Sequence, residues 1–226
     1  MSDWGKEIKN DWGNEGSDSQ FQPQYRAPEP NNGLSQDGMN AMMYGIGDET
    51  SETPDKIEIK RATEEDLPKV WGIIDKCAKW LAEKGYRHWV DHYTEEMMGK
   101  MIRKQETFLG YQNGEAVATL TFDAKPPKYY ITDDYLKYFT EPEEPGGYIM
   151  AVGVVPEYQG QGIAVQMLQY AEDEAYLRRL KWLRLDARTE VPGLIKFYEN
   201  RGFQKVGEPM NEGENESYQL MEKRLN

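Results

Sequence analysis

One segment of the sequence constrains the fold and the chemistry more than any other. An apolar run from Val152 to Val155 leads through Pro156 into a glycine-rich turn and then into a helical pattern. The first N–H groups of a helix have no partner within it, and the peptide dipoles place partial positive charge there, so such a junction binds an anion. Gly160 and Gly162 allow close approach of the backbone to a ligand. The segment therefore predicts a phosphate-binding turn between a buried strand and a helix.

Two kinds of phosphate site use this design, and the spacing of small residues separates them. A dinucleotide-binding fingerprint needs a third small residue three positions after its second glycine, where this chain has Val165. Only about sixty residues follow the turn, too few for the rest of a doubly wound dinucleotide-binding domain. Asp186 does follow at the roughly twenty residues that the fingerprint expects. The spacing weakens the dinucleotide interpretation without removing it.

The other match is closer. The pattern Gln159-x-x-Gly162-x-Ala164 resembles the acetyl-CoA pyrophosphate loop of the GNAT superfamily of N-acetyltransferases, which has Gln or Arg, two residues, Gly, one residue, and then Gly or Ala. The resemblance implies that acetyl-CoA binds here, with its pyrophosphate on the loop and its pantetheine arm hydrogen-bonded to the preceding strand. The residues that it assigns to this binding are Val152, Val154, Gln159, Gly160, Gln161, Gly162, Ile163 and Ala164.

The resemblance extends beyond this loop. Residues 183–187 look like the next strand of the family, and residues 193–203 are similar to its helix that carries a tyrosine ahead of a Gly-Phe turn. The likeness covers residues 56–226 and is strongest over 148–207. It implies that the fourth and fifth strands splay apart and that the acetyl group passes directly from the thioester to an amine. Tyr198 matches the family's tyrosine, whose hydroxyl protonates the departing thiolate.

The general base is not evident from the sequence. Where some relatives have a glutamate on the fourth strand, this chain has Met150, and an asparagine found in many relatives after the fifth strand is replaced by Val191. For each remaining candidate taken alone, a solvated or structural role is favoured over the role of base. These candidates are Glu143, Glu144, Asp186, His88 and His92. The two histidines are four residues apart, but two ligands without a wider frame do not specify a metal site, and we predict none.

The periodicity of apolar residues predicts an α/β fold with the element order βααβββαβαββ, a mixed, mostly antiparallel sheet with helices on both faces. An Asn113-Gly114 turn predicts a hairpin. Expected strands lie at 57–61, 107–112, 116–122, 148–155, 182–187, 203–207 and 217–223, and expected helices at about 63–81, 94–104, 162–179 and 194–200. In the resembled family the region corresponding to 85–93 commonly forms the acceptor-binding wall. We expect the long connection 124–147 to cover the acceptor side.

The composition changes near residue 54. Residues 1–54 carry ten acidic against three basic residues, are rich in Gly, Asn, Ser and Pro, and lack sustained periodicity, so we expect a disordered tail ahead of a domain at 55–226. The tail nevertheless contains two Asp-Trp-Gly repeats, at Trp4 and Trp12, and tryptophan gains free energy mainly when its ring is buried. Either the tail is solvated, or it docks on a protein partner or on a second copy of the chain.

The net charge and the cysteine content limit the kinds of partner and the compartment that we expect for this chain. The net charge of −13 argues against nucleic acid and favours cationic substrates. The single cysteine, Cys77, rules out an internal disulfide and a cysteine zinc cluster and favours a reducing compartment. No apolar run reaches the roughly eighteen residues of a membrane span, and no signal peptide is evident. We therefore expect a cytoplasmic protein without a membrane partner.

Two functions from different classes remain open. The first is an N-acetyltransferase that transfers the acetyl group of acetyl-CoA to a small-molecule amine, an amino-acid derivative or a protein amine. The second is a silent GNAT-fold module, such as a virion-associated phage particle protein, docked through its N-terminal tail. A third variant keeps the fold but transfers a longer acyl group.

Overall fold

The computed structural model describes residues 55–191, 193–213 and 216–225. The predicted tail of residues 1–54 lies outside them. The helical segments are η2 (Glu64–Asp66), α2 (Leu67–Glu83), α3 (His88–His92), α4 (Glu95–Lys104), α5 (Lys128–Thr132), η3 (Tyr135–Tyr138), η4 (Pro156–Tyr158), α6 (Ile163–Leu177) and α7 (Leu194–Glu199). The strands are β1 (Glu58–Arg61), β2 (Glu106–Gln112), β3 (Glu115–Asp123), β4 (Gly146–Val154), β5 (Trp182–Arg188), β6 (Gln204–Gly213) and β7 (Glu216–Arg224).

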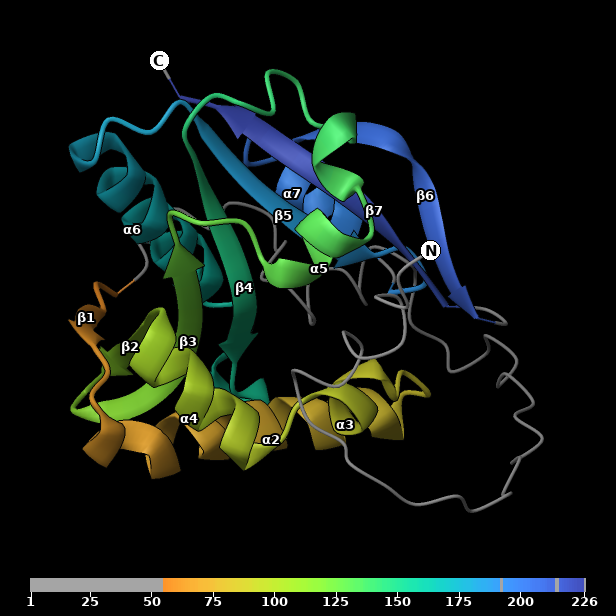
Figure 1. The fold of residues 1–226 in the computed structure, drawn as a ribbon. Helices are drawn as coiled ribbons and strands as arrows, with labels where there is room; N and C mark the ends of the chain where they lie inside the picture. Colours follow the sequence, from red (N-terminus) through yellow and green to blue (C-terminus); the bar gives the residue numbers. More distant parts are fainter. Residues whose placement is uncertain (1–54, 192, 214–215, 226) are drawn as a thin grey trace.

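The strands and the longer helices follow the predicted order. They form one seven-stranded sheet with the order β1-β2-β3-β4-β5-β7-β6 (Figure 1). Every neighbouring pair is antiparallel except β4 and β5, which run parallel. The fold class predicted from the sequence is confirmed. The sequence did not predict the short helices α3 and α5, because helices of a single turn show no periodic apolar pattern.

The predicted hairpin joins β2 and β3. Asn113 and Gly114 both have positive φ, at 52° and 84°. Positive φ at both central residues is typical of the two-residue turn whose twist matches that of the flanking strands. A side chain at Gly114 would meet open space, so the glycine is needed for its backbone angle rather than for room. The turn sets the register of the two strands, with Phe108 opposite Leu120 in the core.

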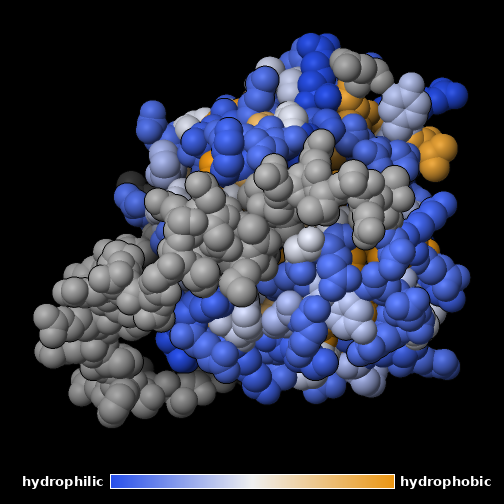
Figure 2. All heavy atoms as spheres, turned by 180° about the vertical axis from the view of Figure 1, so that it is seen from behind, coloured by the Kyte–Doolittle hydropathy of each residue, from blue (hydrophilic) through white to orange (hydrophobic). Residues whose placement is uncertain are grey.

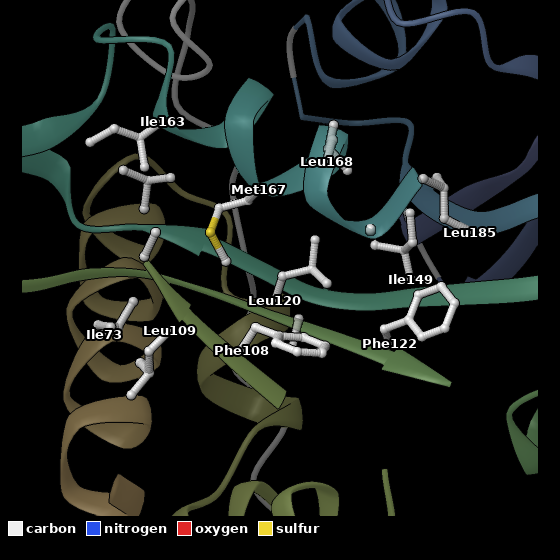
Figure 3. Packing of buried hydrophobic residues seen from close by; sticks show 14 of the residues in the cluster. Ile73, Phe108, Leu109, Leu120, Phe122, Ile149, Ile163, Met167, Leu168 and Leu185 are labelled. Carbon is white, nitrogen blue, oxygen red and sulfur yellow. The ribbon is translucent and has the colours of Figure 1, made fainter. Parts of the chain in front are cut away.

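Helices cover both faces of the sheet. Apolar side chains at helical spacing bury one face of α2, α4 and α6, as amphipathic helices do when they pack on a sheet. Figure 3 shows strands lying between Ile73 of α2 and Met167 of α6, so these two helices lie on opposite faces. Met167 can pack closely on the sheet because Gly110 of β2 has no side chain. A Cβ at Gly110 would lie 2.9 Å from Met167 Sδ.

Strand β6 is longer than predicted. The sequence suggested an end near residue 207, because Pro209, Asn211 and Gly213 are turn-forming residues, but the strand continues to Gly213. Pairing with β7 overrides local preference there, with shifts in register on the way. An edge strand tolerates Pro209, since one side of its backbone faces no neighbouring strand.

The connection between β3 and β4 is held against the sheet by a buried arginine. Arg184 of β5 has no exposed surface, and its guanidinium donates to the carbonyl oxygens of Thr140 and Glu141 at 3.1 and 2.9 Å. The carboxylate of Glu222 on β7 lies 3.9 Å from Arg184 Nε and accepts hydrogen bonds from the Thr140 N–H. A buried charge needs such partners, so the segment after η3 is fixed in place.

The described surface is mostly hydrophilic. On the face shown in Figure 2, hydrophobic residues appear only as small, scattered patches. The exposed large apolar side chains include Tyr176 and Leu177 at the end of α6 and Ile131 on α5. Among the helices of the described residues, none has the length and apolar character needed to cross a membrane.

Candidate active site

The sheet opens between its two central strands. Strands β4 and β5 pair only over Gly146–Tyr148 and Trp182–Arg184, and beyond these residues they diverge, as the resemblance implied. A cavity of about 760 Å³ occupies the opening, within the range that small-molecule sites require. Its walls are residues 149–154 of β4 and 186–188 of β5, with further side chains from α2, α3, α5 and α7.

The glycine-rich turn lies at one end of this cavity. Gly160 and Gly162 have φ of 81° and 73°, in the left-handed region that favours glycine, and Gly162 is the N-cap of α6. No described residue accepts a hydrogen bond from the main-chain N–H groups of 160–165. A small hollow beside the turn shares Val154, Gln159 and Ala164 with the large cavity. The turn therefore presents unpaired donors next to the opening between the strands.

The side chain of Gln159 braces the turn. Its Nε2 donates to the carbonyl oxygen of Val154 at 3.0 Å, and Cys77 Sγ on α2 donates to the same oxygen at 3.2 Å. Gln161 Nε2 donates to the carbonyl oxygen of Glu157 at 3.4 Å. These two amides thus bind the protein's own backbone, whereas the main-chain N–H groups of the turn have no acceptor among the described residues. No residue pattern predicted these two side-chain hydrogen bonds.

Strand β4 is irregular where it lines the cavity. Ala151 has a φ of 49°, and the pairing with β3 shifts between Thr119 and Thr121, so Ala151 and Val152 stand opposite the single residue Leu120. Such a bulge turns main-chain groups out of the ladder and is frequent beside active sites. Val152 and Val154, assigned to cofactor binding from the sequence, both line the cavity next to it.

Tyr198 on α7 lies in the same cavity. It is 7% exposed, and its ring packs edge-on against Phe197 and Phe203, at 5.3 and 5.7 Å between centroids. Burial raises the pKa of its hydroxyl, and the nearby Asp186 and Tyr93 raise it further. The phenol therefore stays protonated at neutral pH and can donate its hydroxyl hydrogen to an acceptor in the cavity, such as a thiolate.

The structure separates the five candidates for the base. Glu143 and Glu144 are exposed and do not line the cavity, whereas Asp186, His88 and His92 do. Burial, together with the charge of Arg188, lowers the pKa of His88 to about 4, so its imidazole is neutral at physiological pH. Among the residues with described positions, no three His, Cys, Asp or Glu side chains gather in a metal-binding group.

Asp186 is the centre of a tyrosine cluster that the sequence did not reveal. Its Oδ2 accepts hydrogen bonds from the hydroxyls of Tyr129 and Tyr130 on α5, at 2.6 and 2.8 Å. Tyr93 also lines the cavity, and its hydroxyl interacts with the backbone of Ala151. Burial and Asp186 raise the pKa values of Tyr93, Tyr129 and Tyr130, so all three phenols stay neutral.

Val191 is buried and lines the cavity where the resembled family often has an asparagine. It packs with Leu81 of α2 and Leu194 of α7. This wall of the cavity is therefore apolar, and a ligand beside it is held by contact area rather than by a side-chain amide.

The comparisons with known proteins agree with this geometry. The model of the acetyltransferase (GNAT) family matches residues 74–203, more than half of the chain, and includes the glycine-rich turn and Tyr198. The chain belongs to the GNAT acetyltransferase family. A curated relative, the uncharacterized N-acetyltransferase YesJ of Bacillus subtilis (strain 168), is 23% identical over 168 residues, covering 73% of this chain and 88% of YesJ. The chain is therefore an enzyme of the GNAT N-acetyltransferase type.

Solved GNAT structures share the fold. An acetyltransferase of Listeria monocytogenes 4b F2365 superimposes with a TM-score of 0.63 at 20% identity, covering 77% of this chain and 99% of that one. The PaiA N-acetyltransferase of Thermoplasma acidophilum, solved in complex with coenzyme A, gives 0.57 at 18% identity over 75% and 99% of the two chains. A GNAT acetyltransferase of Elizabethkingia anophelis with bound acetyl-CoA gives 0.52 at 18% identity, over 76% and 99%.

Proposed function

We propose that this GNAT enzyme transfers the acetyl group of acetyl-CoA directly to an amine, in a small molecule, an amino-acid derivative or a protein. The main support for the proposal is the position of the glycine-rich turn. Its unpaired N–H groups lie at one end of the cavity between β4 and β5. The main chain from Gly160 to Ala164 would hold the pyrophosphate, and the exposed edge of β4 near Val152 and Val154 would hold the pantetheine arm.

In this reaction the amine nitrogen forms a bond to the thioester carbonyl carbon, the carbon–sulfur bond breaks, and the thiolate takes a proton. Main-chain groups near the bulge at Ala151 would stabilise the negative charge that develops on the carbonyl oxygen. Tyr198 would supply the proton to the sulfur, because its buried phenol stays protonated and lines the cavity. The amine must give up its own protons before or during attack.

Direct transfer is favoured over an acyl-enzyme by the state of Cys77. This residue lines the cavity and would be the natural thiol nucleophile. Burial raises its pKa to about 12, with a further contribution from the charge of Glu157, and its Sγ is hydrogen-bonded to the Val154 carbonyl oxygen. Only the thiolate is an effective nucleophile, so the thiol is inert at neutral pH.

Calorimetry with acetyl-CoA tests the proposal. We expect the wild-type protein to bind it, and Gly162→Glu to weaken binding by about a thousandfold or more, because a carboxylate at the helix start excludes the diphosphate by both bulk and charge. Gly72→Glu is the matched control, since Gly72 on α2 has open space around its Cα and lies outside the cavity.

Two results would contradict the proposal. Equal affinity in the wild type and Gly162→Glu would remove the turn from cofactor binding. No acetyl-CoA binding in the wild type, with a protein partner captured only when residues 1–54 are present, would favour the silent interaction module. Tighter binding of a longer acyl-CoA would instead identify another acyl donor.

A further inference from the structure

One carboxylate oxygen of Asp186 accepts hydrogen bonds within the protein, and the other is open to the cavity. Tyr129 and Tyr130 both donate to Oδ2, whereas Oδ1 has no hydrogen-bond partner among the described residues. The carboxylate lies in the cavity wall that β5 contributes, facing the α5 side. Two buried tyrosine donors fix its orientation, so its free oxygen is held in place before a ligand arrives.

Aromatic rings surround this carboxylate. Tyr93, Tyr129, Tyr218 and Trp89 line the same cavity, and Trp89 stacks edge-on against Tyr93 at 5.2 Å. Aromatic faces attract cations, and a carboxylate among them forms a site for an ammonium group. The phenols add no negative charge of their own, because burial raises their pKa values. The charge that a ligand meets here is that of Asp186.

The cations of the lining do not cancel this charge. Arg188 and Lys128 are both engaged in interactions within the protein, and Arg188 Nη1 lies 3.7 Å from Glu190 Oε1. His88 is neutral at physiological pH. Two further carboxylates line the cavity: Asp133, and Asp91, which is itself paired with Arg87 at 3.2 Å. The balance favours a cationic ligand over an anionic one, in the same direction as the net charge of the chain.

We propose that Asp186 Oδ1, with the rings of Tyr93 and Tyr129, binds the ammonium group of the acetyl acceptor, and that the acceptor is a primary amine without a carboxylate beside its nitrogen. An α-amino acid would bring its own carboxylate against Asp186 at short range, where like charges repel strongly. This inference rests on the proposed acetyl transfer, since it assigns the acceptor end of the same cavity.

Three matched pairs of acceptors test the inference. They are phenethylamine with phenylalanine, isobutylamine with valine, and pentylamine with norleucine, which differ within each pair only by the α-carboxylate. Release of free thiol from acetyl-CoA gives kcat and KM for each. We expect at least one amine to be acetylated with a kcat/KM at least about tenfold above that of its amino acid.

Variants of the cluster make the test specific. In Asp186→Asn, the KM for the amine should rise at least about tenfold, the usual cost of losing one charged partner, while the Kd for acetyl-CoA stays within about twofold. Tyr129→Phe keeps the carboxylate and should raise the amine KM only about threefold. Glu144→Gln is the matched control, because its exposed side chain lies outside the cavity. Unfolding midpoints confirm that each variant is folded.

The outcomes separate this inference from the proposed function. An unchanged amine KM in Asp186→Asn, a preference for the amino acids, or no acetylation of any of the three amines by protein that binds acetyl-CoA would each overturn the acceptor site. Failure of the wild type to bind acetyl-CoA would overturn the proposed function instead. The site is then tested by calorimetry of phenethylamine alone, where equal affinity in the wild type and Asp186→Asn rejects it.

Discussion

The two ends of the β4–β5 pair differ in what satisfies their polar groups. At the closed end, Gly146 and Gly147 bring β4 against β5, and a Cβ at Gly147 would lie 2.6 Å from the ring of Phe122. At the open end the same strands diverge around the cavity. Arg184 and Asp186, two residues apart on β5, point to the same face. The protein itself provides partners for Arg184, whereas one oxygen of Asp186 is left open to the cavity.

This difference separates stability from function along one pair of strands. The closed end sets the point at which β4 and β5 begin to diverge. Beyond it no residues of the two strands are paired, which leaves the opening between them. Polar side chains at the closed end should therefore matter for folding, and those at the open end for turnover. Substitutions at each end can break or sharpen this distinction.

The largest effect is expected at the closed end. Arg184→Met should lower the free energy of unfolding by about 3–5 kcal/mol, because it leaves the Glu222 carboxylate buried without its cation. Denaturant titration measures the change. The exposed pair of Arg103 with Glu64 supplies the control, and Arg103→Met should cost less than about 1 kcal/mol. Adding Glu222→Gln to Arg184→Met should restore part of the lost free energy. Equal costs for Arg184→Met and Arg103→Met would contradict the distinction between the two ends.

At the open end, Tyr198→Phe should lower kcat by about 100-fold or more, the usual contribution of a positioned acid. The affinity for acetyl-CoA and the free energy of unfolding should change little, since the ring and its contacts remain. Steady-state kinetics and calorimetry measure both quantities. Tyr170→Phe, at a tyrosine of α6 outside the cavity, should keep full turnover. Full turnover in Tyr198→Phe would remove the proton-donor role.

The smallest effect concerns pH. His88 has its pKa lowered from 6.5 to about 4, so the unfolded chain binds its proton more readily than the folded one does. Its contribution to stability is complete above pH 6.5 and is lost as the pH falls toward 4, by at most about 3 kcal/mol before solvent screening of the partly exposed ring reduces it. The free energy of unfolding of the wild type should therefore fall relative to that of His88→Asn over this pH range. Parallel curves for wild type and His88→Asn would reject the shift.

Local patterns were enough to predict most of the fold. Amphipathic spacing predicted α2, α4 and α6, and the Asn113-Gly114 turn predicted the hairpin, because these features depend on residues close together in the chain. The same reasoning failed for β6, whose second half is held by β7 rather than by its own preference. It also left α3 and α5 unpredicted, and these two short helices carry much of the cavity lining.

The candidate site divides in the same way. The glycine-rich turn and Tyr198 were predicted from motifs, and the structure places both at the cavity. Their roles stay predictions until they are measured. The sequence listed five equivalent candidates for the base, and only the fold separated the exposed Glu143 and Glu144 from the cavity residues.

The sequence alone determined the order of the strands and longer helices, the glycine-rich turn and the absence of any cysteine partner for Cys77, since each follows from residue type and short spacing. The tertiary structure decided where β4 and β5 separate, which carboxylate meets the tyrosines, and that Cys77 is buried and hydrogen-bonded to the Val154 carbonyl oxygen. Tyr129 and Asp186 are 57 residues apart in the chain. Contacts at such distances depend on how whole strands and helices pack, and no local pattern encodes them.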